Sequence, residues 1–453
     1  MSYSQFLEQF TALFDPAPIV GLARQTRWMI RQGTIDAFEF VVGLVFGQMS
    51  ALQLTLNAQA SSYTEPVSRQ AVDQRYHERT VDFLRATFDH CLSRSLAQGP
   101  DPSLTQSLAA HFASVDLVDS TSFDCPESLA KILPGCGGAA SAANAKVLLR
   151  YEYLRGQFAP LALVPGKRSD QGLAAQLTSL ARPNGLVITD KAFVKLELLR
   201  HIDQAQGYFL MPWPRSLSLW LPSPVGGRTA LDLAQVLRHS DLAVVEFSQV
   251  FLGQGDQALP VRLVAFRLRP ESAARHRAAL REAQRKQGRT PTQQALELAG
   301  WLILLTNVPA EKLPARAVSY LYRVRWQIEL VFKQCKSVLR LDLTEARTKA
   351  PRVLCEIWAR LIAALAIFAC HAHVQRACWT QRQREISFAQ VARQIQQSGL
   401  LLAQALIEGG QRLRQQLHSL WRRLLRTTIK GRQRTRKTTW ENLVEHWLGL
   451  APN

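Results

Sequence analysis

Apolar residues recur at helical spacing along the first hundred residues, where few positions indicate strands. Prolines and glycines interrupt the pattern and mark turns. We therefore predict a helical domain over residues 1–105. Two strongly apolar stretches are too short or too interrupted by glutamine to cross a membrane, and we predict that both form buried helices: FVVGLVFGQMSALQLTL, from Phe40, and LIAALAIFAC, from Leu361.

After residue 105 the pattern changes to short apolar runs of the kind that form strands. Helical patterns fill the intervals between these runs, at residues 170–181 and 191–204. This alternation predicts a mixed α/β core whose first part covers residues 106–204. The predicted strands are SVDLVD from Ser114, AKVLLRYEYL from Ala145, FAPLALVPG from Phe158 and GLVITD from Gly185.

A second series of short apolar runs predicts a β-rich insertion over residues 205–307, interrupted by a basic, polar stretch at 269–292. Helical periodicity then returns. We assign residues 308–375 to the second part of the core and 376–453 to a basic helical C-terminal region. The strands predicted in the insertion are GYFLMPWP, LSLWLP, AVVEFSQVFL, LPVRLVAFRL and WLILLT.

The charged residues are mostly basic. The chain has 55 Lys and Arg residues and 35 Asp and Glu residues, which gives a net charge of +20. A hydrophobic content of 47% argues against global disorder, so this is a folded protein whose charge favours a polyanionic partner. Between Gln411 and Trp440 there are ten Lys or Arg residues and no acid. Phosphate contact explains this run better than a solvated helix face does, and its candidates include Arg432, Arg434, Arg436 and Lys437.

A polar helix is also predicted within EPVSRQAVDQRYHER, with Ser68 as its N-cap. Arg69, Gln70 and Arg75 lie on it, and Arg and Gln are the side chains that contact guanine and adenine edges in the major groove. A solvated helix face explains the same residues, and the basic net charge slightly favours DNA contact, which makes residues 1–105 a predicted DNA-binding domain.

The N-terminus lacks the features of a secretory signal, so we expect a cytoplasmic protein. Its seven cysteines are scattered without a C-x-x-C pair, which favours free thiols. Cys370, His371, His373 and Cys378 could be interpreted as a zinc site, but they lie in an apolar helical run without the spacing of a zinc finger. We expect no zinc there.

Two aspartates end strand-like runs, Asp119 after SVDLV and Asp190 after GLVIT. Carboxylates at strand ends can hold the divalent ions that assist phosphodiester cleavage, because magnesium prefers hard oxygen ligands. Caps and turns use Asp at such positions as well. Asp116 and Asp124 compete with Asp119 for the first position. Strict alternation would point Asp116 and Asp119 to opposite faces of the strand.

A third carboxylate lies in a predicted helix, SYLYRVRWQIELVFKQCKSVLRLD, which begins at Ser319. Tyr322, Arg325, Glu329 and Lys336 have offsets of 0, 3, 7 and 14, which gather on a stripe about 60° wide at 100° per residue. Such a stripe would hold phosphate beside a metal ion. An ordinary ion pair between residues 325 and 329 explains the charges equally well.

The spacing Y-x2-R-x3-E-x6-K within YRVRWQIELVFKQCK resembles the signature of bacterial insertion-sequence DDE transposases of the IS-four family. VDLVDSTSF and GLVITDKAFVKLELL resemble the two aspartate segments of that family, and TNVPAEKLPARAVSYLYRVRWQIE resembles its approach to the glutamate helix. One departure is D-K-A-F, where Ala192 replaces a glycine found in many relatives. That change affects local loop geometry rather than the carboxylate.

The resemblance implies an RNase H-like core with a β-rich insertion, and metal-dependent cleavage and strand transfer at transposon ends. Asp119, Asp190 and Glu329 would bind two Mg²⁺ or Mn²⁺ ions. Tyr322, Arg325 and Lys336 would contact DNA phosphates. Some members form a DNA hairpin and flip a base onto a tryptophan of the insertion, for which Trp301 is the matching candidate.

The implied partners are double-stranded DNA, both terminal inverted repeats and target DNA, and a second copy of the chain in a synaptic homodimer. The implied location is the bacterial cytoplasm, at the nucleoid, with no membrane partner. Two alternatives stay open. An RNase H-like nuclease or resolvase would share the carboxylates without strand transfer, and a transposase-derived DNA-binding protein would keep the basic surfaces without catalysis.

Overall fold

The computed structural model describes residues 2–31, 33–49, 55–96, 106–137, 140–224, 226–255, 257–382, 384–431 and 442–448. The chain forms two compact units, each assembled from segments distant in sequence. The first comprises Met1–Gln106, Ser120–Arg168 and Ile328–Arg434, and the second comprises Ser107–Asp119, Ser169–Gln327 and Thr435–Asn453. These boundaries differ from the five predicted segments, and that division stays a prediction.

The first unit begins with the predicted helices. The Ser2 hydroxyl accepts from Gln5 N while the Gln5 side chain accepts from Ser2 N, a capping box that starts α1. Asp15 caps α2, which starts with a proline, the residue that tolerates a first helical turn best. The helices are α1 (Tyr3–Leu13), α2 (Pro16–Gln25), α3 (Ala37–Met49), α4 (Leu56–Ala60), α5 (Arg69–Gln74) and α6 (Glu78–Leu96).

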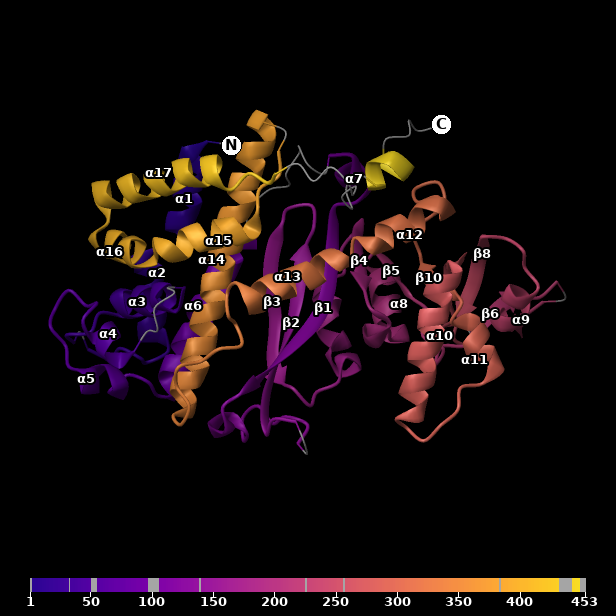
Figure 1. Ribbon diagram of the computed structural model, residues 1–453, viewed down its shortest axis with the longest axis horizontal. Helices are drawn as coiled ribbons and strands as arrows, with labels where there is room; N and C mark the ends of the chain where they lie inside the picture. The colour runs from indigo at the N-terminus through magenta and orange to yellow at the C-terminus, as the bar shows by residue number, and fades with distance from the viewer. Residues whose placement is uncertain are drawn as a thin grey trace. The chain divides into compact units, whose positions relative to one another are not determined.

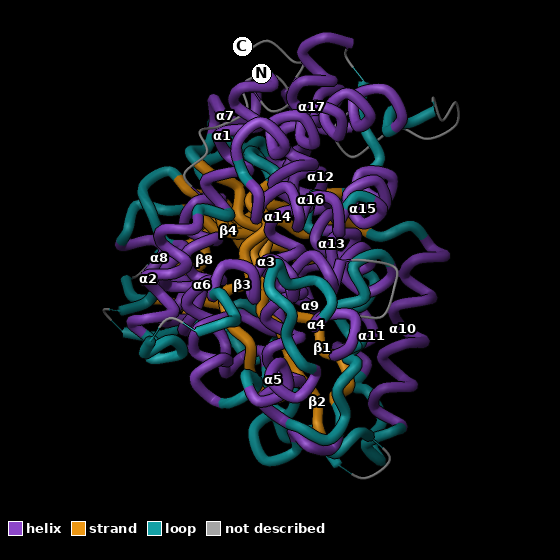
Figure 2. Tube along the Cα trace, turned by 90° about the vertical axis from the view of Figure 1, so that its left-hand side faces the viewer, coloured by secondary structure: helices purple, strands orange, loops and turns teal. Residues whose placement is uncertain are grey.

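The core of this unit is built around α14 (Ala350–Arg382), which packs against α3, α6 and strand β3 (Figure 1). By length and composition α14 could cross a membrane, but 89% of its apolar stretch is buried inside the unit. Figure 2 shows α3 beside α14, with α16 (Gly399–Glu408) beside α3. Because α3 is apolar on all sides, it requires this enclosure. The second predicted buried helix is therefore confirmed, and the first is confirmed up to Met49, while residues 50–54 lie outside the described residues.

Strands β2 (Ala143–Glu152) and β3 (Gln157–Pro165) form an antiparallel hairpin in the first unit, as predicted. The hairpin packs on α14 through Phe158 and Phe368, whose rings stack with centroids 4.5 Å apart. The remaining helices of this unit are η1 (Glu127–Leu129), α15 (Phe388–Gln397) and α17 (Gly410–Thr427).

The second unit contains a mixed sheet in the order β1-β4-β5-β10-β9-β8-β6-β7. All five strands predicted in the insertion are present, and β7 is an addition. The first of them, β5, also belongs to the core order given below, and the others extend the sheet beyond it through antiparallel pairing of β10 with β5. The strands are β4 (Gly185–Thr189), β5 (Tyr208–Pro212), β6 (Leu219–Pro222), β7 (Arg228–Ala230), β8 (Val244–Leu252), β9 (Leu259–Arg267) and β10 (Trp301–Thr306).

Strand β1 (Ser114–Cys125) begins in the second unit and ends in the first. It pairs in parallel with β4, and β4 pairs in parallel with β5. The resulting order β3-β2-β1-β4-β5 is that of an RNase H-like core, which confirms the predicted fold class.

Short helices complete the second unit. The predicted helical pattern at 170–181 forms a 3₁₀ helix, and the one at 191–204 is divided between η3 and α8. The basic stretch after β9 forms α10, whose polar surface is almost wholly exposed. The elements are α7 (Gln106–His111), η2 (Asp170–Leu180), η3 (Lys191–Phe193), α8 (Leu196–Gln204), α9 (Leu233–Arg238), α10 (Pro270–Arg285), α11 (Gln293–Leu298), α12 (Ala315–Arg323) and η4 (Val444–Leu448).

Two predicted helices are interrupted. The polar helix capped by Ser68 covers only residues 69–74, and a turn separates it from α6, because Arg75 N and Tyr76 N donate to carbonyls three residues earlier. The cap itself is confirmed, since Ser68 Oγ accepts from Ala71 N. The helix predicted from Ser319 is likewise divided into α12 and α13 (Trp326–Ser337).

The Cys and His residues considered as a zinc site lie on α14. His373 is 1% exposed, and neither of its ring nitrogens has a hydrogen-bond partner among the described residues. Burial, reinforced by the Arg376 charge, lowers the pKa of His373 to about 3. The folded chain therefore holds this imidazole neutral inside the helical core.

We predict that the first unit loses stability as pH falls below about 6.5, because the unfolded chain then protonates His373 and the folded chain does not. This residue contributes about 1.4 kcal/mol per pH unit until its folded pKa is reached. Urea unfolding of wild type and His373→Leu between pH 5 and 7 measures the effect. The variant should show the shallower dependence, whereas the exposed-site control His239→Gln should match wild type. Equal slopes for His373→Leu and wild type would contradict the assignment.

Candidate active site

The parallel pairing of β1 with β4 sets the positions of the first two candidate carboxylates. Both strands are buried over their apolar residues, and the register ends with Val118 opposite Thr189. Asp119 and Asp190 are the next residues on each strand and therefore lie level with each other. Neighbouring strands are about 4.8 Å apart, so both carboxylates belong to one small region. Each is only partly buried and can be reached from solvent.

Asp116, the competitor on the same strand, has a different environment. Its side chain is fully buried, and its Oδ2 accepts from Arg182 at 2.6 Å and from Ser114 Oγ at 3.0 Å. Asp124 is exposed and accepts from Asn144 Nδ2 at 2.9 Å. Asp116 therefore has a structural role in the core, through its ion pair with Arg182. Asp124 has a structural role at the start of β2, through its hydrogen bond with Asn144. Asp119 remains the candidate ligand.

Tyr322 and Arg325 lie beside the two aspartates in the second unit. Arg325 Nη1 is 3.3 Å from Asp119 Oδ2, and its guanidinium carbon is 5.9 Å from the centre of the Tyr322 ring. Burial raises the pKa of Tyr322 to about 12, Arg325 lowers it, and the charges of Asp190 and Asp119 raise it further. The tyrosine therefore keeps its hydroxyl proton and can donate it in a hydrogen bond.

Arg325 reaches Asp119 from the break between α12 and α13. Val324 N, Arg325 N and Gln327 N each donate to a carbonyl three residues earlier, instead of the four-residue spacing of an α-helix. Val324 is fully buried at this point. The prediction of one continuous helix from residue 319 is therefore wrong, because the backbone is tighter at this break, and the stripe from residue 322 to 336 stays a prediction.

Glu329 and Lys336 lie on α13 within the first unit, two turns apart on a continuous helix. Ile328, Val331 and Cys335 form the buried face of α13, and Glu329 is partly exposed. Lys336 Nζ donates to Ser122 O at 2.8 Å and attaches the helix to the second half of β1. Both predicted residues thus lie in a folded, anchored element.

The donor chemistry of these residues fits a divalent metal ion. Among the described residues, no three Asp, Glu, His or Cys side chains are gathered closely enough to hold one. The two level aspartates nevertheless offer hard carboxylate oxygens, and the position of Arg325 shows that a cation is favoured beside Asp119. Two carboxylates of the second unit therefore suit a divalent metal ion.

Two tryptophans differ in exposure. Trp301 is 9% exposed, and the Arg267 guanidinium covers its ring at 4.5 Å, so stacking on a flipped base would require Arg267 to move. Its role in base binding stays a prediction. Trp326 is 55% exposed and directly follows Arg325. Sequence reasoning assigned it no role, although its place outside the apolar stripe of the helix is a signal of exposure.

The other predicted DNA contacts are distributed over the rest of the chain. Arg69 and Gln70 are exposed on the six-residue α5, while Arg75 lies half-buried over the Trp28 ring at 5.1 Å. The last of these residues also lines a polar cavity of about 450 Å³ with Gln74 and His77. The remaining candidates fall outside the described residues: Arg432, Arg434, Arg436 and Lys437.

An RNase H-like core with two acidic strand ends beside a tyrosine and an arginine defines the class of nucleic-acid enzymes that cleave and transfer phosphodiesters with divalent metal ions. Residues 110–366 match the family described as "Transposase DDE domain". The chain belongs to this family of DDE transposases.

Two insertion-sequence transposases agree with this assignment. The transposase of insertion sequence IS231F from Bacillus thuringiensis subsp. israelensis is 26% identical over 96% of this chain and 94% of its own length. The transposase of IS1151 from Clostridium perfringens is 26% identical over 78% of this chain and 77% of its own. A solved piggyBac transposase synaptic complex with hairpin DNA covers 94% of this chain and 87% of its own, with 11% identity and a TM-score of 0.46. The predicted insertion-sequence transposase family is confirmed.

We predict that substitution of Asp116 destabilises the fold more than substitution of Asp119 does. Asp116→Ala leaves Arg182 and Ser114 without their shared acceptor and should lower the free energy of unfolding by about 1–3 kcal/mol. Asp119→Asn should change it by less than about 1 kcal/mol, because its ion pair is partly exposed. Chemical denaturation of both variants tests this. A larger loss in Asp119→Asn than in Asp116→Ala would reverse the assignment.

Proposed function

We propose that this DNA transposase cleaves the ends of its element and joins them to target DNA with two Mg²⁺ or Mn²⁺ ions bound by Asp119, Asp190 and Glu329. The observation that carries the proposal is the β1–β4 register, which brings the first two carboxylates level. Glu329 is the acidic residue of the spaced signature and is partly exposed on α13. Membership in the DDE transposase family supports all three assignments.

The metal ions would activate the attacking water or 3′ hydroxyl and stabilise the leaving oxygen. The protein residues have separate tasks. Tyr322 remains protonated and would donate to a phosphate oxygen, while Arg325 would exchange its contact with Asp119 for the scissile phosphate. Lys336 would contact a neighbouring phosphate along α13. The partly exposed position of the aspartates supports this, since DNA must reach them from solvent.

We further infer a cut-and-paste route in which a homodimer pairs two transposon ends in a synaptic complex. The basic composition supports binding of both terminal repeats and target DNA, because each duplex carries a dense phosphate charge. A hairpin intermediate with a flipped base on Trp301 belongs to the same proposal, and it requires the Arg267 side chain to leave the indole. The protein would act in the bacterial cytoplasm, at the nucleoid.

We expect Asp119→Asn, Asp190→Asn and Glu329→Gln each to reduce cleavage of element ends by about 10³-fold or more, because the three act as a unit. Gel-shift binding in EDTA should stay near wild type. Asp124→Asn is the matched control, since Asp124 lies on the same strand but hydrogen-bonds Asn144. Cleavage by folded, DNA-binding Glu329→Gln at the wild-type rate would overturn its assignment, as would loss of activity in Asp124→Asn to the same extent.

Metal preference provides a test of ligation. We expect Asp190→Cys to be inactive with Mg²⁺ and to regain part of its cleavage with Mn²⁺, because thiolate is a poor ligand for magnesium. Asp124→Cys should retain the wild-type preference. The measurement is the ratio of the cleavage rate in Mn²⁺ to that in Mg²⁺, at equal ion concentration. A wild-type ratio in Asp190→Cys would argue against direct coordination of the metal ion by Asp190.

A further inference from the structure

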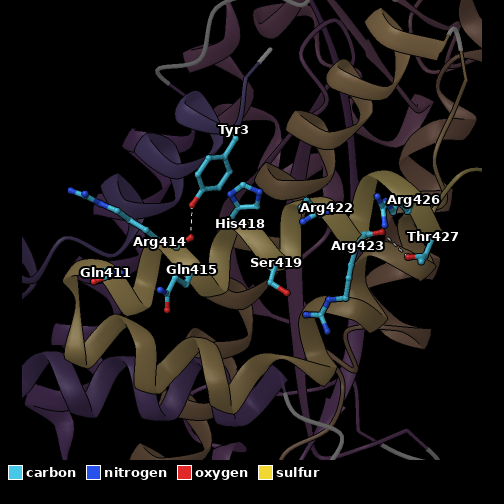
Figure 3. A pocket seen from close by; sticks show the side chains of 10 residues that line it. All are labelled: Tyr3, Gln411, Arg414, Gln415, His418, Ser419, Arg422, Arg423, Arg426 and Thr427. Atoms are coloured by element: carbon cyan, nitrogen blue, oxygen red, sulfur yellow. Dashed lines mark hydrogen bonds between the residues drawn. The ribbon is translucent and has the colours of Figure 1, made fainter.

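The C-terminal helix α17 presents two chemically different faces. Leu413, Leu417, Leu420, Trp421 and Leu424 are buried, and the helix packs on α1, α14, α15 and α16 of the first unit. The opposite face borders a groove of about 730 Å³ (Figure 3), whose charged and ring-bearing lining side chains are Tyr3, Arg414, His418, Arg422, Arg423 and Arg426. No acidic residue is among the described residues that line it.

The cationic side chains follow the helix at regular intervals. Arg414, His418, Arg422 and Arg426 recur every fourth residue and form one ridge along the exposed face. Twelve residues of α-helix are about 18 Å long. Arg423 lies beside this ridge, where its Nη2 donates to Ser398 Oγ at 2.7 Å. The groove therefore presents a line of positive charge rather than a single point.

Other cations nearby have acidic partners. Arg412, on the same helix, contacts both carboxylate oxygens of Glu408 at 2.5 Å, and Lys430 lies 2.8 Å from Glu385. No such ion pair is recorded for the three ridge arginines within the described part of the chain. Charge compensation thus occurs around the groove but not in it.

The N-terminal segment fixes one wall of the groove. Tyr3 Oη donates to Arg414 O at 2.5 Å, and its ring centre lies 4.8 Å from that of His418 (Figure 3). Together with the buried leucines, this contact holds α17 firmly against α1. A rigid scaffold lowers the entropic cost of engaging a rigid partner.

We propose that the α17 groove binds the phosphate backbone of duplex DNA, without reading base sequence, at a distance along the chain from the catalytic carboxylates. This inference rests on the proposed function only in that the protein acts on DNA. Measured along the duplex axis, an 18 Å ridge covers about five base-pair steps at 3.4 Å each. Guanidinium groups suit phosphate because they donate two parallel hydrogen bonds.

The same observations disfavour a membrane surface. Helices that bind at a lipid interface insert their apolar face, but the apolar face of α17 is already buried in the unit. The outward face lines the groove with cationic and polar side chains. The net charge of +20 also favours an extended polyanion such as DNA over an acidic patch on a protein.

The test is binding of the full chain to a random-sequence 30-bp duplex, in EDTA so that cleavage plays no part, over a range of salt concentrations. For Arg414→Gln/Arg422→Gln/Arg426→Gln we expect the slope of log K against log salt to become shallower by about 2.7, at about 0.9 per lost phosphate contact. Affinity for a duplex carrying the element's own end should fall by the same factor.

A matched pair of single variants covers the case in which the triple variant does not fold. Arg422→Gln should make the slope of log K against log salt shallower by about 0.9. Arg412→Gln removes an equal charge from the same helix but should leave that slope unchanged, because Arg412 pairs with Glu408. Thermal unfolding of each variant verifies its fold.

Three results would overturn the proposal: wild-type slopes in folded groove variants, a loss confined to the element's own end, or a change in oligomeric state without a change in DNA affinity. The last would assign the groove to a second copy of the chain. A wild-type protein that binds DNA through the groove but cleaves nothing with Mg²⁺ or Mn²⁺ would contradict the proposed catalysis and leave the groove assignment supported.

Discussion

Parallel pairing of β1 with β4 is the interaction on which the candidate site depends. Hydrogen bonds between the two strands hold Val118 opposite Thr189, and the aspartates that follow are level only in this register. A shift of one residue would reverse the faces of every side chain on β1 and expose its buried apolar residues. The hydrophobic core therefore enforces the register, and the register positions the carboxylates.

Strand β1 carries two aspartates in different environments. Asp116 lies three residues before Asp119, inside the sheet, where Arg182 and Ser114 satisfy it. Asp119 lies where the burial of β1 decreases, so its charge can attract a cation from solvent. A chain with a net charge of +20 thus keeps a small acidic region at the end of two buried strands.

Much of this arrangement could be predicted from the sequence, because apolar periodicity is a local property. The strands before both aspartates were predicted from their apolar runs, and Glu329 from a spaced signature around it. Contacts between distant residues could not be predicted. The role of Asp116 depends on Arg182, 66 residues away, and the cover over Trp301 depends on the register that places Arg267 opposite it.

The break before α13 was also beyond local reasoning, since every residue from 319 to 342 tolerates a helix. Its cause is tertiary: Val324 is buried and Arg325 contacts Asp119 across 206 residues of sequence. Strand β7, with three residues, is too short to produce a recognisable period. Prediction succeeded where an element is long and periodic, and failed where an element ends for reasons distant in sequence.

Because α13 is continuous, it fixes the spacing between the side chains it carries. Glu329 and Lys336 are separated by seven residues of uninterrupted helix, about 10.5 Å along its axis, and they face nearly the same side. Lys336 donates a hydrogen bond to Ser122 O of β1, which fixes the position of this end of α13. The distance between an acidic group and the next cationic group is thus a property of helix geometry. Any DNA strand engaged by both must match that length.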